Sequence, residues 1–479
     1  MSEISDGAAA TLSSLLSDKR GRKIVCVQGL GFVGAANAIA IASARDAAGN
    51  PLYNVVGVDL PTDSGRERAA AVNQGEFPFA TTDAALIAAA QSAHLAGNLV
   101  AVADASAFGA ADIIVVEIGL DIQDKTPKVD LPPFRAAIGT VGDHMKADAL
   151  VLLESTVPPG TTERIVAPLL RQRLAARSLP TQALKLAYCY ERVMPGDGYL
   201  ASIVDMWRVY AGITAQAADA AEAFLASFID TAKRPLTRLE SIRAVEMAKV
   251  LENTFRAVNI ALIDEWEKFA RRIDVDLFEV LKAIRVRPTH QNIRYPGLGV
   301  GGNCLSKDPM FGATSAKDIF GLADFEFPLS TAAVTINSRM PAATVALLEE
   351  TFPDGLAGKR VLILGASYRE DVGDTRHSPS LTLAGMLIGK RATVAFADPL
   401  VEAEIGVPLH RELPDARGFD AVILAVGHKP YRAIDLAAWS GAERPVVLDA
   451  NGVLSRQQLQ SLRDAGFEVA AIGRGLLRR

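Results

Sequence analysis

Cysteine and histidine are scarce in this sequence, and both are scattered. The 479 residues include three cysteines (Cys26, Cys189 and Cys304) and six histidines. The cysteines lie too far apart for a disulfide framework or a metal site, and the histidines lack the spacing of metal ligands. We therefore expect no bound metal, and thiols that stay reduced indicate a cytoplasmic protein. Cys26 lies inside the apolar run Ile24–Val27, which predicts that it packs in the core.

Long apolar and basic runs are also missing. No apolar run reaches the roughly 18 residues that a membrane-spanning helix needs, and the cluster from Leu12 to Leu16 is too broken for a signal peptide. The net charge of −5 and the lack of a long basic run argue against a nucleic-acid partner. The length suggests two or three domains, preceded by a flexible tail over residues 1–21.

The first clear motif is a glycine turn between a strand and a helix. An apolar strand is predicted at Lys23–Val27, and Gly29, Gly31 and Gly34 follow it before an alanine-rich helix at Ala35–Ala44. The first glycine permits a tight turn, the second lets the backbone approach a pyrophosphate, and the third lets helix and strand pack closely. The uncapped N–H groups of the helix favour an anion there. This order predicts a dinucleotide-binding site.

An acid after the next strand indicates which dinucleotide binds. Tyr53–Val58 is a second apolar strand, and Asp59 follows it. A carboxylate at this point bonds the ribose 2′-hydroxyl and repels a 2′-phosphate, so NAD is expected rather than NADP. Arg66 and Arg68 lie close by in the sequence, and an arginine can accommodate a 2′-phosphate, so NADP stays open.

Further strands are predicted at Asp112–Ile118 and Ala149–Leu153, with helical stretches between them. This alternation favours a parallel, doubly wound sheet. The segment Glu154–Thr162 leads from a strand end into a helix, where ligands of such sheets bind. A helix cap with a proline turn explains the segment equally well, and the two interpretations are compatible. The predicted cofactor-binding residues are Gly29, Gly31, Phe32, Val33, Gly34, Asp59, Ser155 and Thr156.

A helical pattern runs from about Glu240 to Ile273 without proline or glycine. Lys249, Asn253 and Arg256 fall on one face of it. A solvated face is the ordinary explanation for Lys and Arg, but Asn is a poor choice for a helix interior unless its amide is used. A helix of this length often forms a dimer spine, so we expect a homo-oligomer.

A second α/β unit begins at Lys359–Ala366 and continues through apolar strands at 392–397, 421–426 and 445–448. It has no G-x-G-x-x-G turn, so a second NAD is not expected. Arg369 and Arg376 follow its first strand and could clamp a diphosphate by charge-assisted hydrogen bonds. The alternative is that they pair with neighbouring aspartates.

The segment Tyr295–Pro309 carries a lone thiol in a glycine-rich loop. Gly297, Gly299, Gly301 and Gly302 precede Cys304, and Lys307 and Asp308 follow it. Glycines let the backbone adopt positive φ and approach a ligand closely, and a thiolate is a nucleophile whose reactivity depends on charge and exposure. A cysteine packed as a small apolar residue is the commoner case, so both interpretations stand on local context.

These motifs, in this order, resemble the UDP-glucose/GDP-mannose dehydrogenase (UDP-sugar 6-dehydrogenase) family over nearly the whole chain, from about residue 22 to 475. The resemblance implies an α/β fold with two Rossmann-like doubly wound domains, joined by a long central helix and a helical middle domain. It implies a NAD-binding domain at 22–238, a central domain at 239–338 and a UDP-sugar-binding domain at 339–479. It also implies a homodimer or higher homo-oligomer, with a UDP-sugar as the small-molecule partner.

The family oxidises C6 of a nucleotide sugar from alcohol to carboxylate with two NAD⁺. By resemblance, Cys304 is the nucleophile that carries the intermediate, and Lys249 and Asn253 stabilise the C6 oxyanion. Asp308 and Thr156 position water and relay protons, and Glu191 assists thioester hydrolysis. The implied substrate-binding residues are Glu191, Arg192, Lys249, Asn253, Arg256, Tyr295, Gly301, Asn303, Arg369 and Arg376.

The resemblance is closest to the UDP-N-acetylhexosamine branch, through Glu191-Arg192 before Pro-Gly and through Thr254–Ala261. We expect a UDP-N-acetylhexosamine as substrate, with UDP-glucose as the alternative. The chain departs from the family pattern at Tyr190, at Asn303 and in the loop Glu117–Asp121. A two-electron β-hydroxyacid dehydrogenase is a remote alternative, but it needs neither Cys304 nor a second α/β domain. A non-catalytic subunit that only binds a nucleotide sugar is a further alternative.

Overall fold

The computed structural model describes residues 21–120, 131–402 and 404–475. The chain divides into two compact units. Unit 1 comprises Met1–Leu251 and Met310–Glu326, and unit 2 comprises Glu252–Pro309 and Phe327–Arg479. The long helix α9 (Ile242–Arg272) contributes residues to both. The predicted tail lies almost wholly outside the described residues.

Unit 1 is built on an eight-stranded sheet with the order β3-β2-β1-β4-β5-β6-β7-β8. All neighbouring strands are parallel except β6 and β7, which are antiparallel. The order reverses between β1 and β4, which creates the crevice where such sheets bind ligands. The strands are β1 Lys23–Gln28, β2 Tyr53–Val58, β3 Leu99–Val102, β4 Ile113–Val116, β5 Leu150–Leu153, β6 Lys185–Tyr190, β7 Val209–Gly212 and β8 Thr237–Arg238.

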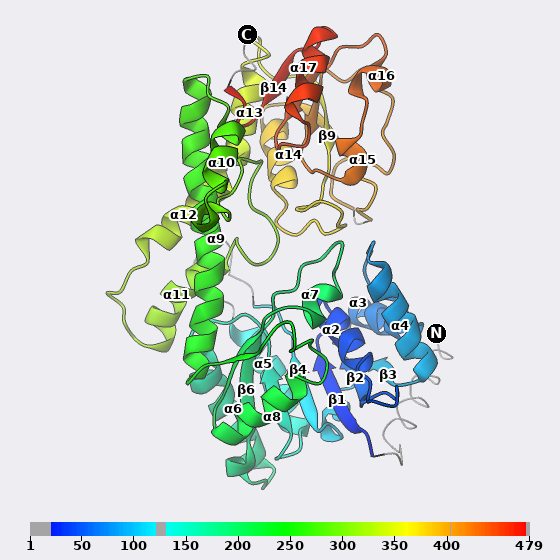
Figure 1. Ribbon diagram of the computed structural model, residues 1–479, viewed down its shortest axis with the longest axis vertical. Coiled ribbons are helices and arrows are strands. Elements are labelled where there is room, and N and C mark those ends of the chain that lie inside the picture. Colours follow the sequence, from blue (N-terminus) through cyan, green and yellow to red (C-terminus); the bar gives the residue numbers. More distant parts are fainter. Residues whose placement is uncertain (1–20, 121–130, 403, 476–479) are drawn as a thin grey trace. The chain divides into compact units, whose positions relative to one another are not determined.

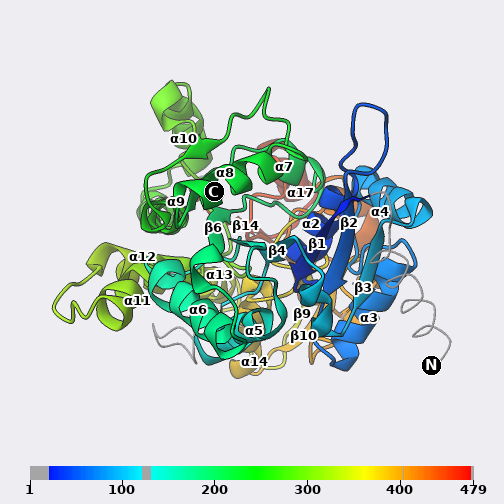
Figure 2. The same cartoon turned by 90° about the horizontal axis from the view of Figure 1, so that it is seen from below.

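The central strands of this sheet are buried on both faces, because helices cover both sides (Figure 2). Continuous apolar runs such as those of β4 and β5 fit strands covered in this way. One face packs against α2 (Phe32–Ala42), α4 (Ala84–Ala96) and α8 (Ala215–Leu225). The other packs against α5 (Leu131–His144), α6 (Ala167–Ala176) and the start of α9.

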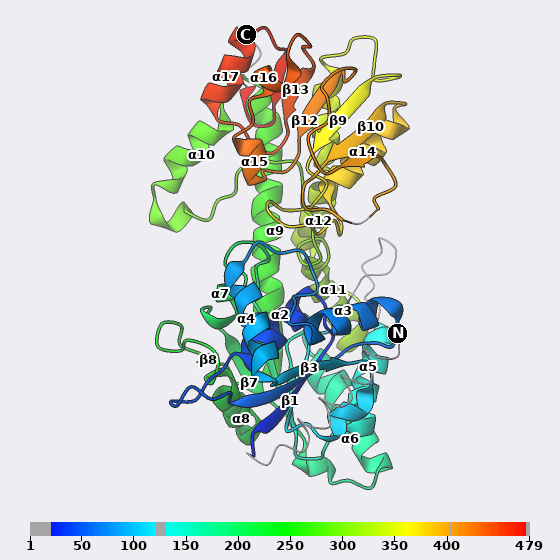
Figure 3. The ribbon, with the colours of Figure 1, turned by 90° about the vertical axis from the view of Figure 1, so that its right-hand side faces the viewer.

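Unit 2 contains a six-stranded, wholly parallel sheet with the order β11-β10-β9-β12-β13-β14. Figure 3 shows α14 (Pro379–Gly389) on one side of it and α17 (Arg456–Asp464) on the other. Helix α13 (Pro341–Glu349) packs on the same face as α14. The strands are β9 Arg360–Leu364, β10 Thr393–Ala397, β11 Leu409–His410, β12 Ala421–Leu424, β13 Val446–Asp449 and β14 Val469–Ala471.

Helix α9, the long green helix of Figure 1, is 31 residues long. Large apolar side chains recur along one stripe of it and are about half exposed. They are Met247, Leu251, Phe255, Leu262, Trp266 and Phe269, with Ile273 just beyond its end. The stripe is an exposed apolar surface on this helix. Within the described part of the chain, no helix is long and apolar enough to cross a membrane.

The predicted fold class is confirmed: two parallel-dominated sheets are combined with a helical middle region. The long helix lies within two residues of its predicted bounds at both the start and the end. The predicted strands at 112–118 and 149–153 are shorter: the first loses one residue at its start and two at its end, where the chain leaves the ladder at Glu117, and the second loses one residue at its start. The antiparallel strand β7 had no sequence signal that we recognised. The three-domain division stays a prediction.

Candidate active site

The glycine turn of unit 1 has the shape that a dinucleotide needs. Gly29 has φ +89°, and a Cβ on Gly34 would lie 1.8 Å from the carbonyl oxygen of Gly29, so no side chain fits at Gly34. Gly31 is the N-cap of α2 and supplies no side-chain hydrogen bond to the first turn. The N–H groups of that turn therefore point toward the switch point without a side-chain cap. Phe32 stacks on Phe79 at 3.9 Å between ring centroids, which orders the start of the helix.

Asp59 lies beside this turn, as predicted, but it has a cationic partner. Its carboxylate accepts hydrogen bonds from the backbone N–H of Leu30 at 3.1 Å and of Leu60 at 2.7 Å. Arg68 donates to both carboxylate oxygens, with Nε at 2.8 Å and Nη2 at 3.2 Å. Arg66 instead pairs with the exposed Asp63. The predicted ribose-binding acid is thus partly neutralised by Arg68, one of the two arginines noted in the sequence.

The turn after β5 is fixed from two sides. The Ser155 hydroxyl accepts the backbone N–H of Ile118 at 2.9 Å, which ties the ends of β4 and β5 together. Glu246, on α9, accepts the backbone N–H groups of Gly160 at 2.5 Å and Thr162 at 2.9 Å. Burial raises the pKa of Glu246 to about 7. Thr156 lies between these anchors and is partly buried.

Lys249 is buried rather than solvated, which is contrary to the ordinary explanation of a helix lysine. Its Nζ donates to the backbone oxygen of Glu191 at 2.7 Å and lies 3.3 Å from Oε1 of the same residue. Arg192 bonds the hydroxyl of Tyr190 at 2.8 Å and lies over its ring, and Lys249 lies 5.5 Å from the centroid of that ring. Tyr190 thus contacts both cations and orders the loop that carries Glu191.

A second group of charges lies at the same end of the unit 1 sheet. Asn37, on α2, donates from Nδ2 to Glu117 at 2.8 Å and to Glu154 at 3.1 Å. Arg208 is fully buried and donates to Glu154 at 3.1 Å. Glu117 begins the loop that departs from the family pattern; the last residue of that loop, Asp121, lies outside the described residues. Asn37 and Arg208 were missed from the sequence, because nothing local links residues so far apart.

In unit 2, Cys304 is exposed, whereas Cys26 and Cys189 are buried in unit 1. The prediction that Cys26 packs in the core is thereby confirmed. The carbonyl of Cys304 accepts the backbone N–H groups of Lys307 at 3.3 Å and Asp308 at 2.9 Å, so the thiol begins a tight turn. Exposure is the condition that a nucleophilic thiol must meet.

The glycines before Cys304 serve mainly to bring the loop close to the rest of unit 2. Only Gly302 has positive φ, at +75°, and a Cβ there would lie 2.8 Å from the Tyr368 ring. A Cβ on Gly301 would lie 2.6 Å from Cβ of Tyr368, and one on Gly299 would lie 2.8 Å from Pro379. These glycines therefore pack closely against protein, and the expectation that the loop also approaches a ligand stays a prediction.

Behind the thiol lies a buried polar group. Asn253 Nδ2 donates to Asp308 at 2.7 Å, and Lys307 Nζ donates to the other carboxylate oxygen at 2.9 Å. All three side chains are buried, and Asp308 is fully so. Asn253 therefore uses its amide, as its position inside a helix suggested. Lys249 lies one turn before it on α9.

The two arginines after β9 differ in their partners. Arg376 forms a fork with Asp374, at 3.0 Å from Nε and 2.7 Å from Nη2, so the predicted alternative of pairing with a local aspartate holds for it. It is still 47% exposed. Arg369 is exposed, and no ion pair of it is found among the described residues. Burial, followed by the charges of Asp374 and Cys304, raises the pKa of Tyr368 to about 12.

Three arginines gather near Tyr295 in unit 2. Arg285 lies 4.8 Å from the centroid of the Tyr295 ring, and Tyr295 stacks on Phe278. Burial and the nearby charges of Arg256 and Arg285 lower the pKa of Arg294. Mutual repulsion of this kind is relieved by an anion, so the cluster is a second candidate contact for a phosphate group. Only Arg256 and Tyr295 of this cluster were predicted from the sequence.

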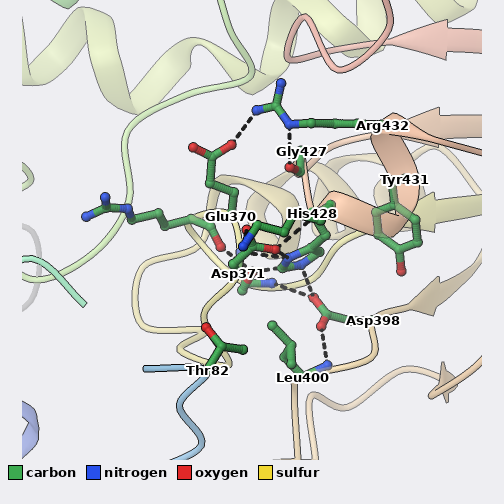
Figure 4. Close-up of polar contacts among 12 residues, drawn as sticks. Thr82, Glu370, Asp371, Asp398, Leu400, Gly427, His428, Tyr431 and Arg432 are labelled. Carbon is green, nitrogen blue, oxygen red and sulfur yellow. Dashed lines mark hydrogen bonds and ion pairs between the residues drawn. The ribbon is translucent and has the colours of Figure 1, made fainter. Parts of the chain in front are cut away.

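Unit 2 also has an acid, Asp398, directly after its second strand, but protein groups of unit 2 already use its hydrogen-bonding capacity. His428 is fully buried; its Nδ1 accepts the backbone N–H of Asp371 at 2.9 Å, so Nε2 carries the proton toward Asp398 at 3.2 Å (Figure 4). Asp398 also accepts the backbone N–H groups of Ala366 and Ser367. This cluster locks the loop after β9 and leaves Asp398 no exposed surface for a ligand.

Three domain models of one family match the chain. The NAD binding domain of the UDP-glucose/GDP-mannose dehydrogenase family matches residues 23–228, its central domain matches 243–339, and its UDP binding domain matches 362–456. The first of these domains binds NAD. The glycine turn fits that cofactor, because α2 starts without a side-chain cap and position 34 has room only for glycine.

Relatives are similar over nearly the whole chain. The UDP-N-acetyl-D-mannosamine dehydrogenase of Methanococcus maripaludis is 30% identical over 95% of this chain and 97% of its own length. The NDP-N-acetyl-D-galactosaminuronic acid dehydrogenase of Ralstonia solanacearum is 27% identical over 91% and 97%. A solved UDP-D-ManNAc dehydrogenase structure from Pyrococcus horikoshii has a TM-score of 0.79 at 27% identity, covering 95% of this chain and 100% of that one. The chain therefore belongs to the UDP-glucose/GDP-mannose dehydrogenase family and is an NAD-dependent nucleotide-sugar dehydrogenase.

Proposed function

We propose that this enzyme oxidises C6 of a UDP-N-acetylhexosamine to the carboxylate, with Cys304 as the acyl carrier. The observation that carries the proposal is the contrast among the three thiols. Cys304 is exposed at the start of a turn that is backed by Asn253, Lys307 and Asp308, whereas the other two cysteines are buried. NAD⁺ held by the glycine turn and Asp59 supplies the hydride acceptor for both oxidations.

The first oxidation needs a group that stabilises an alkoxide at C6. Lys249 and Asn253 are cationic and amide donors one helical turn apart, and both are buried, which strengthens their hydrogen bonds. Loss of a proton and a hydride from the alcohol gives the aldehyde. The proposal requires that both side chains reach the same oxygen.

The second oxidation passes through the thiol. The Cys304 sulfur adds to the aldehyde carbon to form a thiohemiacetal, and loss of a second hydride and a proton gives a thioester. Water then attacks the thioester, with Glu191 or Asp308 accepting its proton, and the C–S bond breaks to release the acid and restore the thiol. Asn253 and Lys307 hold the Asp308 carboxylate for this role.

The UDP moiety is assigned to the exposed arginines of unit 2. Arg369 and Arg376 follow the first strand of its sheet, and Arg256, Arg285 and Arg294 form a second positive cluster. An N-acetylated sugar is preferred because the family motifs around Glu191 and Thr254 fit that branch. The relatives from M. maripaludis and R. solanacearum are also named for N-acetylated sugars.

A substrate panel tests the proposal. NADH formation is measured with UDP-glucose, UDP-galactose, UDP-GlcNAc, UDP-ManNAc, UDP-GalNAc and GDP-mannose. We expect the highest kcat/KM with one N-acetylated sugar and two NADH per sugar consumed. Preference for UDP-glucose would overturn the sugar assignment alone. One NADH per sugar, with the aldehyde as final product, would overturn the four-electron reaction.

We also propose that two copies pair through the apolar stripe of α9. The stripe presents Phe255, Trp266 and Phe269, each more than half exposed, on a single helix face. Exposed apolar patches of this kind mark protein–protein contacts. Trp266→Asp should convert a dimer into a monomer in sedimentation equilibrium. Glu265→Gln, a change at the exposed residue just before Trp266, should leave the dimer intact. A wild-type monomer would contradict the assignment.

A further inference from the structure

Glu117 and Glu154 form a close acid pair at the carboxyl edge of the unit 1 sheet. Glu117 follows β4 and Glu154 follows the neighbouring strand β5. Asn37 donates to one oxygen of each, at 2.8 Å and 3.1 Å, and the two carboxyl groups are within hydrogen-bonding reach of one another. Two carboxylates this close do not both ionise readily, so a proton is expected between them.

The hydrogen bonds of Glu154 point to the site of that proton. Its Oε2 accepts from Asn37 and from Arg208. Its Oε1 is buried, and no donor for it is found in the described ranges of the chain. A buried acceptor without a donor is costly. A protonated Glu117 supplies the missing donor. Burial, followed by the charges of Glu154 and Glu191, raises the pKa of Glu117 well above its usual value.

The surrounding charges agree with one bound proton. Among the residues that the structure describes, the titratable and charged groups around the pair are Cys189 on β6, Glu191 after β6, Arg208 before β7 and Lys249 on α9. Cys189 is neutral, because burial raises the pKa of its thiol. Three carboxyl groups then face two cations, so one added proton makes the buried cluster neutral. An isolated buried charge would be strongly unfavourable.

The pair lies beside the cofactor site. The Glu117 carbonyl oxygen is 3.0 Å from where a Cβ on Gly29 would lie, and its own Cβ is 3.2 Å from a Cβ on Gly34. Strands β1 and β4 flank the point where the strand order reverses. Asp59, after β2, marks the adenosine side, so the nicotinamide half extends toward β4 and β5.

We propose that Glu117 is a protonated acid that donates to Glu154, and that this pair sets the relative affinity of the enzyme for NAD⁺ and NADH. The nicotinamide ring carries a positive charge in NAD⁺ and none in NADH. Loss of the Glu117 proton to solvent adds a negative charge beside that ring, and therefore favours NAD⁺ over NADH. The inference concerns the cofactor alone and holds whichever sugar is the substrate.

Equilibrium binding across pH tests this. The Kd of NADH is measured by its fluorescence and that of NAD⁺ by competition, from pH 6 to pH 9.5, without sugar. In the wild type, the ratio of the NADH Kd to the NAD⁺ Kd should be constant at low pH and rise about tenfold as Glu117 ionises. Glu117→Gln, which keeps the shape and the neutral charge, should hold the low-pH ratio throughout.

Two further variants sharpen the outcome. The Asn37 hydrogen bond lowers the pKa of Glu117, so Asn37→Ala should move the rise to higher pH. Asp143→Asn, an exposed acid that pairs with Arg173, should behave as the wild type. A wild-type ratio that stays flat to pH 9.5 would overturn the proposal. So would a rise that survives in Glu117→Gln, or a wild-type ratio at pH 6 that already exceeds that of the variant.

Discussion

The two parallel sheets share a local topology but present different surfaces at their carboxyl edges. In each, the first strand lies between the second strand and a later one: β1 between β2 and β4, and β9 between β10 and β12. Each also has an aspartate directly after the second strand, Asp59 in unit 1 and Asp398 in unit 2. Sheets of this kind bind ligands at that edge, so their topology alone does not distinguish the two.

The connection after the first strand makes the difference. In unit 1 the glycine turn leads at once into α2, whose N-cap Gly31 adds no side-chain hydrogen bond. In unit 2, residues 365–378 intervene before α14, which is capped by Ser378 and begins with Pro379. Proline has no N–H to offer an anion. The uncapped helix N-terminus at the switch point is thus what unit 1 offers an anion and unit 2 does not.

The largest predicted effect concerns the thiol of unit 2. Cys304→Ser should lower four-electron turnover by on the order of 1000-fold or more, because a hydroxyl is a much weaker nucleophile at neutral pH. NADH affinity should stay within about twofold, since the glycine turn belongs to unit 1. Turnover is followed by NADH absorbance and affinity by NADH fluorescence.

Thiol labelling provides the control for this variant. Iodoacetamide should modify only Cys304 in the folded wild type, because burial shields the other two cysteines and raises the pKa of Cys26 to about 12. Cys189→Ala should retain full catalytic chemistry. Undiminished turnover after complete labelling of Cys304 would mean that the thiol is not the acyl carrier.

The next largest effect concerns the glycine turn. Gly34→Ala places a Cβ 1.8 Å from the carbonyl oxygen of Gly29, so the turn or the helix must shift. We expect NADH affinity to fall by about 100-fold, near 3 kcal/mol, and the melting temperature to fall as well. Binding is measured by NADH fluorescence and folding by circular dichroism.

Gly31→Ala is the matched control, because an added Cβ there meets no atom within 4 Å and φ is −67°. It should leave the melting temperature unchanged and weaken NADH binding less. Equal losses in both variants would mean that the turn tolerates no side chain for reasons other than steric contact.

Sequence patterns predicted what local chemistry encodes. The glycine spacing located the turn after β1, the absence of proline and glycine located α9, and the flanking residues made Cys304 a candidate. Lys249 was harder, because its burial depends on Glu191 and Tyr190, which are distant in the sequence. Periodicity places a residue on a helix face but does not say what covers that face.

Contacts between residues at the ends of different strands could not be predicted from the sequence, for the same reason. Asn37, Glu117 and Glu154 come together only because α2 begins, and β4 and β5 end, at the same edge of the sheet. Arg208 precedes β7, whose antiparallel pairing with β6 was not predicted. Without that pairing nothing places its guanidinium on Glu154. Tertiary pairing, rather than local propensity, decides where such buried ion pairs form.

A smaller effect concerns the buried acid of unit 2. Asp398→Asn weakens the hydrogen bonds to Ala366, Ser367 and His428, which should destabilise the loop by about 2 kcal/mol at neutral pH. Burial opposes ionisation of Asp398, but the hydrogen bonds from His428 and from the backbone N–H groups of Leu400 and Ala366 outweigh it and lower the pKa of Asp398. The stabilisation is therefore complete above the unfolded pKa and lost as pH falls through the lower folded pKa.

Hydrogen–deuterium exchange of the backbone amides of residues 365–371 measures the stability of that loop. In the wild type, exchange corrected for intrinsic rates should speed up as the pH falls below about 4, whereas the variant should already exchange fast at pH 7. Asp415→Asn, an exposed aspartate that pairs with Arg417, is the control and should not change this segment. A slow-exchanging variant would show that Asp398 does not lock the loop.

The smallest effect concerns the corresponding acid of unit 1, which Arg68 partly neutralises and which is expected to face the ribose. Arg68→Ala leaves the Asp59 carboxylate without its cation, so a 2′-phosphate meets stronger repulsion. The NADPH Kd should rise relative to that of NADH by only about five- to tenfold, because the pair is partly exposed and solvent screens it.

Arg66→Ala, which removes a cation paired with the exposed Asp63, is the control and should change this ratio little. If Arg68→Ala instead tightens NADPH binding, Asp59 is not the group that excludes the 2′-phosphate. The acids of the two sheets would then differ in their partners but not in their function, since neither would read the ribose.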